Sequence, residues 1–169
     1  NYVLIQLQNF FTEQQHQQLI MRSEKVQETT AVELKLTADD TSDVYVDGRH
    51  VMKTALLTVG RTYISAKSKV IAVEVTNLFG LDLGLMAETS SGVVTDSTWR
   101  CITDKPAKDW TVASYDDSHW PRAEEYGKND GKLALVPTYS AFPSTRSWIG
   151  VVANKVFHMH MYCRKTLEN

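Results

Sequence analysis

The stretch AVELKLTADDTSDVYVDGRHV, residues 31–51, decides the fold of this chain. Its first half, AVELKL, alternates valine and leucine with polar residues, and this period of two is typical of a β-strand that buries one face. Its second half alternates again on both sides of Asp47 and Gly48, and an Asp-Gly pair is preferred in a tight two-residue hairpin turn. The stretch therefore predicts a strand followed by a β-hairpin.

Short β-branched segments separated by polar turn residues continue through the rest of the chain. We expect a long strand over Val70–Val75, shorter strands in ALLTVG (55–60) and GLMAET (84–89), and a terminal strand within VFHMHMYC (156–163). Many short strands at such spacing are the signature of an antiparallel sandwich or barrel. The sequence thus predicts an all-β fold, and a chain of this length can bury a sufficient core as one domain.

The first thirty residues differ in kind. The segment FFTEQQHQQLIMRSEKVQE combines a candidate capping box, Thr12 with Gln15, with strong helix formers, so we expect a helix from about Thr12 to Val26. The preceding YVLIQLQNFF fits a strand or a helix, and we favour the strand. We divide the chain into a partly helical N-terminal extension, residues 1–30, and a β-sandwich, residues 31–169. The extension could lie across the sandwich, pair with a second copy or attach to a larger body.

Composition and charge exclude several classes of protein. The chain has 18 Lys and Arg against 20 Asp and Glu, without a long block of either sign, so we expect no nucleic acid partner. No apolar run approaches the ~18 to 20 residues that span a bilayer, so we expect no transmembrane segment, and no signal segment opens the chain. Because the chain begins at Asn1 without an initiator methionine, we expect a processed product or a piece of a larger protein.

The two cysteines, Cys101 and Cys163, lie far apart in the sequence. They show no Cys-x-x-Cys spacing and no nearby histidine, so nothing indicates a zinc site. They could form one long-loop disulfide in an oxidising compartment, or remain two separate buried thiols. The spacing alone leaves both interpretations open.

Histidines give little support for catalysis or for a metal. His158 and His160 would project from one face of a strand and could share an ion, but zinc needs three or four ligands and the sequence supplies no third. A solvated sheet face is the plainer interpretation. His16, His50 and His119 stand alone, and no serine or cysteine occupies a nucleophile elbow or a dyad context. We therefore expect a protein that is not an enzyme.

Paired aspartates occur at Asp39 with Asp40 and at Asp116 with Asp117. Neighbouring residues on a strand point to opposite sides, so such a pair alone cannot form the facing carboxylates of a glycosidase. Aspartate side chains commonly fix turns by accepting backbone hydrogen bonds, and we assign this role first to the pair in SYDDSHWPRA (114–123). A loop that binds calcium through these oxygens is the functional alternative, and the metal content is unknown.

The four tryptophans stand at positions 99, 110, 120 and 148. An aromatic face stacks on the apolar face of a sugar ring while a neighbouring aspartate bonds its hydroxyls, so a tryptophan beside an aspartate in a loop suits a carbohydrate site. Burial in the core is the plainer role for each tryptophan taken singly.

Taken together, LTADDTSDVYVDGRHV, SKVIAVEVTN, TDSTWRC and DWTVASYDDSHWPRAEEYG resemble the galactose-binding-domain-like jelly roll, which occurs as sugar-binding modules of bacterial glycosidases and in animal extracellular proteins. The resemblance covers about residues 31–127, and VFHMHMYCRKTL looks like the closing strand of the animal versions. It implies a jelly-roll β-sandwich with ligands at the loops of one end, often beside a structural calcium ion. It also implies that Cys101 and Cys163 pair as a disulfide. The helical extension and the spacer MKTALLTVGRTYISAKS depart from the usual pattern.

The resemblance and the residues together predict an extracellular, non-catalytic module with no certain cofactor. The first hypothesis is a carbohydrate-binding, lectin-like module that presents Asp39, Asp40, Asp117 and an exposed Trp110 or Trp120 to a glycan or glycoprotein. The alternative is a structural or adhesive module that acts through protein contacts, with self-association through the N-terminal segment. A third interpretation is an accessory domain of a glycoside hydrolase.

Overall fold

The computed structural model describes residues 12–23, 31–79, 83–133, 137–151 and 159–168. The chain divides into two compact units, Asn1–Ala31 and Val32–Asn169.

In the first unit a helix spans residues 12–23, and each of its residues is exposed. It covers most of the helix that the sequence predicts. Residues 24–26, where we expected the helix to end, and residues 1–11, where we favoured a strand, lie outside the described residues. No helix in the described part of the chain is long and apolar enough to span a membrane.

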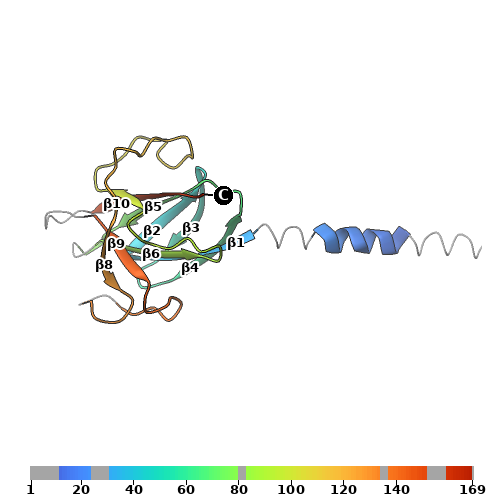
Figure 1. Cartoon of the computed structure of the whole chain (residues 1–169), viewed down its shortest axis with the longest axis horizontal. Coiled ribbons are helices and arrows are strands. Elements are labelled where there is room, and N and C mark those ends of the chain that lie inside the picture. Colours follow the sequence, from blue (N-terminus) through green and yellow to red (C-terminus); the bar gives the residue numbers. More distant parts are fainter. Residues whose placement is uncertain (1–11, 24–30, 80–82, 134–136, 152–158, 169) are drawn as a thin grey trace, which may run out of the picture. The chain divides into compact units, whose positions relative to one another are not determined.

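Two five-stranded sheets, paired in antiparallel fashion, make up the second unit (Figure 1). One sheet has the order β4-β1-β6-β9-β8 and the other the order β3-β2-β5-β10-β7. The all-β prediction is therefore confirmed. The strands are β1 (Ala31–Asp39), β2 (Thr41–Val46), β3 (Arg49–Thr54), β4 (Gly60–Ser65), β5 (Val70–Thr76), β6 (Gly84–Thr89), β7 (Arg100–Ile102), β8 (Glu124–Lys128), β9 (Ser147–Gly150) and β10 (His160–Thr166).

Most of the individual strand predictions hold. The long strand expected over Val70–Val75 is β5, and GLMAET is β6. The strand expected in ALLTVG (55–60) is wrong, because these residues mainly form the turn between β3 and β4. The hydroxyl of Thr58 accepts a hydrogen bond from the N–H of Ala55 at 3.0 Å and donates to the carbonyl of Ala55 at 2.7 Å. These local bonds close the turn and override the apolar pattern.

The hairpin expected at Asp47 and Gly48 joins β2 to β3. Both residues have positive φ angles, 48° and 83°, as the tight hairpin turn preferred by Asp-Gly requires. The carboxylate of Asp47 also accepts hydrogen bonds from the N–H groups of Lys69 and Val70, at 2.9 and 3.0 Å. The turn is therefore tied to the start of β5 as well as to its own two strands.

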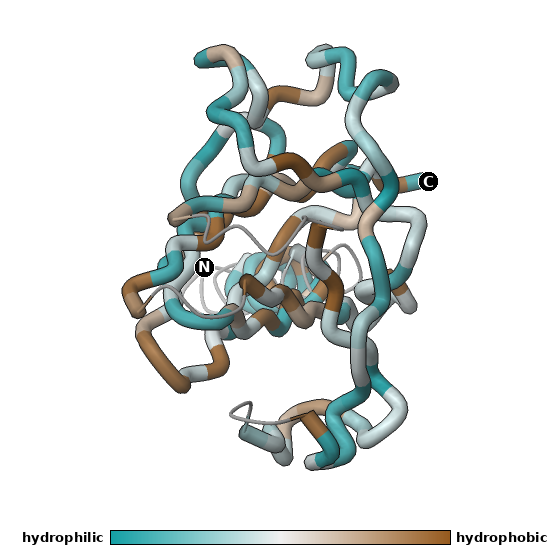
Figure 2. The backbone as a smooth tube through the Cα atoms, turned by 90° about the vertical axis from the view of Figure 1, so that its left-hand side faces the viewer, coloured by the Kyte–Doolittle hydropathy of each residue, from teal (hydrophilic) through white to brown (hydrophobic). Residues whose placement is uncertain are grey.

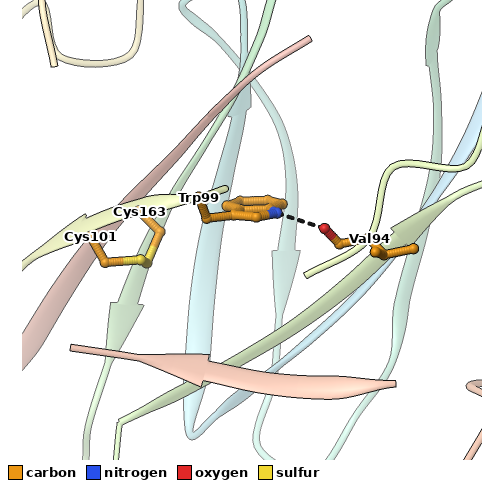
Figure 3. The surroundings of a disulfide bond; sticks show 4 residues. All are labelled: Val94, Trp99, Cys101 and Cys163. Atoms are coloured by element: carbon orange, nitrogen blue, oxygen red, sulfur yellow. Dashed lines mark hydrogen bonds between the residues drawn. A yellow bond between two sulfur atoms is a disulfide. The ribbon is translucent and has the colours of Figure 1, made fainter. Parts of the chain in front are cut away.

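The main core lies between the two sheets. Alternate residues of β1 (Leu34, Leu36) and of β5 (Ile71, Val73) are fully buried in it, as the period of two predicts. In Figure 2 the connections at the top are mostly hydrophilic, apart from short hydrophobic stretches. Trp99 belongs to this core and donates its indole N–H to the carbonyl of Val94 at 2.8 Å (Figure 3).

A disulfide joins Cys101 of β7 to Cys163 of β10, and the predicted pairing is confirmed. The two residues lie directly opposite each other in the antiparallel pair, and both are buried (Figure 3). The bridge ties the short edge strand β7 to its neighbour β10, an interior strand of the sheet. It also closes a loop whose ends are separated by 62 positions in the sequence.

Each sheet is also covered on its outer face by a long connection, one above and one below in Figure 1. Residues 103–123, between β7 and β8, bring Trp110 and Trp120 onto Ala72 and Tyr162. The connection between β8 and β9 brings Tyr139 and Phe142 onto Met86 and Trp148. All four tryptophans are therefore buried, in three separate apolar clusters.

The lower connection is held by charge as well as by apolar contact. Glu88 of β6 accepts a hydrogen bond from Nε of Arg146 at 2.9 Å and pairs with Lys35 of β1, whose Nζ donates to the carbonyl of Ala141 at 2.9 Å. Burial by itself would raise the pKa of Glu88, but the hydrogen bonds from Lys35 and Arg146 outweigh it, so that this pKa is held below its usual value. The ionised form of Glu88 therefore stabilises the fold at neutral pH.

We predict that replacing both Cys101 and Cys163 with alanine lowers the free energy of unfolding by about 3 to 5 kcal/mol, because the long loop is then no longer closed in the unfolded chain. Urea denaturation of the oxidised native protein and of the double variant measures the difference. The native protein unfolded in the presence of a reductant should approach the variant. Equal denaturation midpoints for oxidised protein and double variant would contradict the prediction.

Candidate functional site

A polar cleft of about 560 Å³ opens on the second unit. Its wall comes from the connection between β6 and β7, from β7 itself, from the connection between β7 and β8, and from the end of β10. The charged residues that line it are Arg100, Arg122, Arg164 and Lys165 on the positive side and Asp96, Asp117 and Glu168 on the negative side.

Three of these cations form a row because the strands place them in register. Arg164 of β10 lies opposite Arg100 of β7, and Arg100 forms an antiparallel bridge with Arg122 in the next extended segment. Residues directly opposite each other in antiparallel segments project from the same face. The three side chains therefore project from the outer face of the sheet.

Arg164 is almost fully buried and serves the fold. Its Nε donates to the carboxylate of Asp117 at 2.8 Å, and its other nitrogens donate to the backbone carbonyls of Trp110, Val112 and Tyr115. The guanidinium also lies over the ring of Tyr115, 5.2 Å from its centroid. A buried guanidinium needs such partners, and here they fix the course of the connection between β7 and β8.

Arg100 and Arg122 are more open to solvent. Nη1 of Arg100 donates to the carbonyls of Trp120 and Ser118, at 2.6 and 3.3 Å, while its Nε lies 3.8 Å from the carboxylate of Asp117. Arg122 is exposed, and its Nη1 donates to the carbonyl of Ser97 at 3.4 Å. Both side chains thus keep donor capacity towards the cleft.

On the acidic side, the lining residue Asp96 is committed to its own turn. Its carboxylate accepts a hydrogen bond from the N–H of Thr98 at 2.8 Å and another from the hydroxyl of Thr98. That same hydroxyl contacts Nζ of Lys165. Thr98 therefore links a lysine and an aspartate on one side of the cleft.

Of the five residues that the sequence nominates for a ligand site, Asp117 lines the cleft. Asp39 and Asp40 lie at the other end of the sandwich, because Asp39 pairs with Gly84, the first residue of β6, whereas the cleft residues 91–98 follow its last. Asp40 is buried, and its carboxylate accepts a hydrogen bond from the N–H of Leu78 at 2.6 Å. The structure does not bring Asp39 and Asp40 together with Asp117.

The expectation of an exposed Trp110 or Trp120 is wrong. Their exposed fractions are 8% and 1%, and the two indoles stack with centroids 6.3 Å apart. Trp110 also packs edge-on against Tyr162 of β10. The physical reason lies in their backbones, since Arg164 binds the carbonyl of Trp110 and Arg100 that of Trp120. Both residues are thereby held against the sheet, and neither can stack on a sugar.

The turn role assigned to SYDDSHWPRA agrees with its hydrogen bonds. The carboxylate of Asp116 accepts the N–H of Ser118 at 2.9 Å, and hydrogen bonds from the side chain and backbone of Ser118 lower the pKa of Asp116. The N–H of Trp120 donates to the carbonyl of Asp117 at 2.9 Å. Asp117 adds its contacts to Arg164 and Arg100.

Sequence reasoning missed the arginine row, although a signal for it existed. Arg100 precedes Cys101 and Arg164 follows Cys163. Once two cysteines pair directly across antiparallel strands, the residue before one must face the residue after the other. The predicted disulfide was therefore enough to place Arg100 opposite Arg164. The pairing of Arg100 with Arg122 depends on how the connection between β7 and β8 folds back, which the hydrophobic pattern of the sequence does not indicate.

The sequence left open a metal ion shared by His158 and His160, with a solvated sheet face as the plainer interpretation. His158 lies outside the described residues, and Nδ1 of His160 lies 3.1 Å from the carboxylate of Glu74. Within the described ranges no group of three His, Cys, Asp or Glu side chains is placed to hold a metal ion.

Comparison with known protein families, with curated proteins and with solved structures finds no match to this chain.

We predict that Asp117→Asn lowers the free energy of unfolding by about 3 kcal/mol, because it removes the negative charge that faces the buried guanidinium of Arg164. The matched control is Asp116→Asn on the adjacent, exposed residue, which should change stability far less. Urea denaturation of the two variants measures the difference. Equal losses would show that the two aspartates act alike as turn formers, against the assignment of Asp117 to Arg164.

Proposed function

We propose that this chain is a non-catalytic extracellular module of the galactose-binding-like jelly-roll type, which binds a carbohydrate in the cleft beside β7 and β10. One observation carries the proposal. Planar charged groups and hydroxyls are held by the fold around an open space of about 560 Å³, large enough for a small sugar unit.

The chemistry of the lining suits a sugar. Sugar hydroxyls both donate and accept hydrogen bonds, and the lining offers guanidinium donors (Arg100, Arg122) beside a carboxylate acceptor (Asp117) and the hydroxyl of Thr98. Contacts to backbone carbonyls and to each other already orient Arg100 and Asp117. Such groups lose little freedom when a ligand binds, which favours binding of a polar molecule.

Two features support a binding role in an oxidising compartment. The residues that line the cleft, all within the described ranges, include neither histidine nor cysteine, and Asp117 is engaged by two arginines. These contacts hold Asp117 in the wall of the cleft, which suits a binding role. The buried disulfide is typical of secreted proteins. The two-sheet architecture and the motifs quoted from the sequence support the jelly-roll type.

A glycan array probed with the whole chain tests the proposal, and we predict binding that Thr98→Leu abolishes. The substitution removes a hydroxyl and adds bulk inside the cleft. The matched control is Thr145→Leu at an exposed position in the connection between β8 and β9. Thermal unfolding of each variant verifies the fold. An empty array, or binding unaffected by Thr98→Leu, would refute the proposal.

A second candidate is a structural or adhesive module that acts through protein contacts. Large apolar side chains are exposed in three connections at the end of the sandwich away from the cleft. These connections begin or end at Thr54 of β3, Thr76 of β5 and His160 of β10, and the strand register places these three residues at the same end of their sheet. Exposed apolar groups gathered on one end indicate a contact surface. They are Leu56 and Leu57, Leu78 and Phe79, and Met159.

The N-terminal unit offers another contact surface, because Leu19 and Met21 of the helix are 65% and 60% exposed. An isolated helix of this length is marginal in water, so a partner would stabilise it.

Sedimentation of the chain with and without residues 1–28 separates the two functions. An assembly module should lose mass beyond the deleted residues, whereas a monomeric carbohydrate-binding module should lose those residues alone. A monomer in both cases would reject self-assembly through this segment.

A further inference from the structure

The row of arginines bears on the charge of the ligand. Like charges directly opposite each other in a sheet are destabilising, yet Arg100 has Arg164 on one side and Arg122 on the other. Among the described residues, Asp117 is the carboxylate that contacts two of these three arginines. Arg122 has no such carboxylate contact in the described part of the chain.

The charged residues that line the cleft are four cations against three carboxylates, an excess of one positive charge. Asp96 accepts two hydrogen bonds from Thr98, and Glu168 lies exposed beyond the end of β10. Lys165 adds a further cation through its contact with the hydroxyl of Thr98. This local positive charge stands in a chain whose formal net charge is −2 at pH 7. The cleft therefore differs in sign from the molecule as a whole.

The geometry of the two open arginines suits an anion with several oxygens. Arg100 and Arg122 face the cleft from adjacent extended segments, and a guanidinium binds carboxylate or sulfate oxygens through parallel N–H donors. An anion between them would relieve their repulsion, whereas a neutral hydroxyl would leave it in place. Thr98 and Lys165 stand on the same cleft and could receive neighbouring hydroxyls.

We propose that the glycan bound in this cleft is acidic, and that Arg100 and Arg122 receive its carboxylate or sulfate group. This inference rests on the proposed carbohydrate function and names the class of sugar, a uronic acid or a sulfated sugar. Arg122 is the residue that discriminates acidic from neutral glycans, since among the described residues it contacts no carboxylate, whereas Arg100 lies beside Asp117 and donates to two backbone carbonyls.

The experiment compares Arg122→Gln with Arg49→Gln in the whole chain. Both changes remove one exposed arginine charge, but Arg49 lies on β3, at the opposite edge of the sheet from β7. Calorimetric titrations use oligogalacturonate and its methyl ester, dextran sulfate and dextran, and inorganic sulfate alone. These pairs separate carboxylate from sulfate, and charge from the sugar backbone.

We expect the acidic member of at least one pair to bind more tightly than its neutral counterpart. Loss of a charge-assisted pair in Arg122→Gln should weaken that binding about tenfold or more, whereas Arg49→Gln should leave it within about twofold. Added salt should weaken the acidic interaction as well. Thermal unfolding should show both variants folded.

The contrary outcomes are distinct. Equal binding of acidic and neutral sugars, unchanged in Arg122→Gln, would overturn this inference and leave the carbohydrate function standing. The same weakening in Arg49→Gln would show a general charge effect and also overturn it. Absence of binding to every glycan in the titrations and on the array would overturn the carbohydrate function itself. Binding of sulfate alone, with no glycan bound, would overturn both.

Discussion

The buried contact of Arg164 with Asp117 is the interaction on which the connection between β7 and β8 depends for its position. Arg164 lies on a regular strand, but its N–H groups donate hydrogen bonds to the irregular connection between β7 and β8. A long connection laid over a sheet carries backbone carbonyls that lose water and need donors. One guanidinium supplies several of them, and the aspartate balances its charge. The position of the connection, and with it one wall of the cleft, follows from this contact.

On the opposite sheet, other charged residues hold a connection against the outer face in the same way. There Lys35 and Arg146 meet Glu88, and Lys35 also binds the carbonyl of Ala141. In both cases a cation reaches from a strand into a connection, while aromatic residues of that connection cover the outer face of the sheet. The sandwich is thus a central core with an aromatic layer on either side. Ion pairs set where each layer lies, and apolar burial supplies most of the stability.

Sequence patterning predicted the elements that a few neighbouring residues specify. Alternation located β1, apolar segments bounded by turn residues located β5 and β6, and the Asp-Gly pair located the hairpin. The same reasoning failed at ALLTVG, where a threonine hydroxyl closes a turn. It also failed for the exposed faces of Trp110 and Trp120, because nothing local reveals that a loop will fold back over a sheet. The cysteine pairing came from the family resemblance, not from spacing.

Two arginines of the candidate site, Arg122 and Arg164, differ in what they contribute to the stability of the fold. For folding alone, a neutral residue opposite Arg100 would serve better than Arg122, since it would avoid like charges on neighbouring segments. Arg164 differs, because its charge is buried, paired and needed by backbone carbonyls. Positions that break a local rule without a structural return are the ones where a function is expected. By this criterion the exposed Arg122, which gains only a long hydrogen bond of 3.4 Å to the carbonyl of Ser97, supports the proposed ligand site, whereas the buried tryptophans that first suggested a sugar do not.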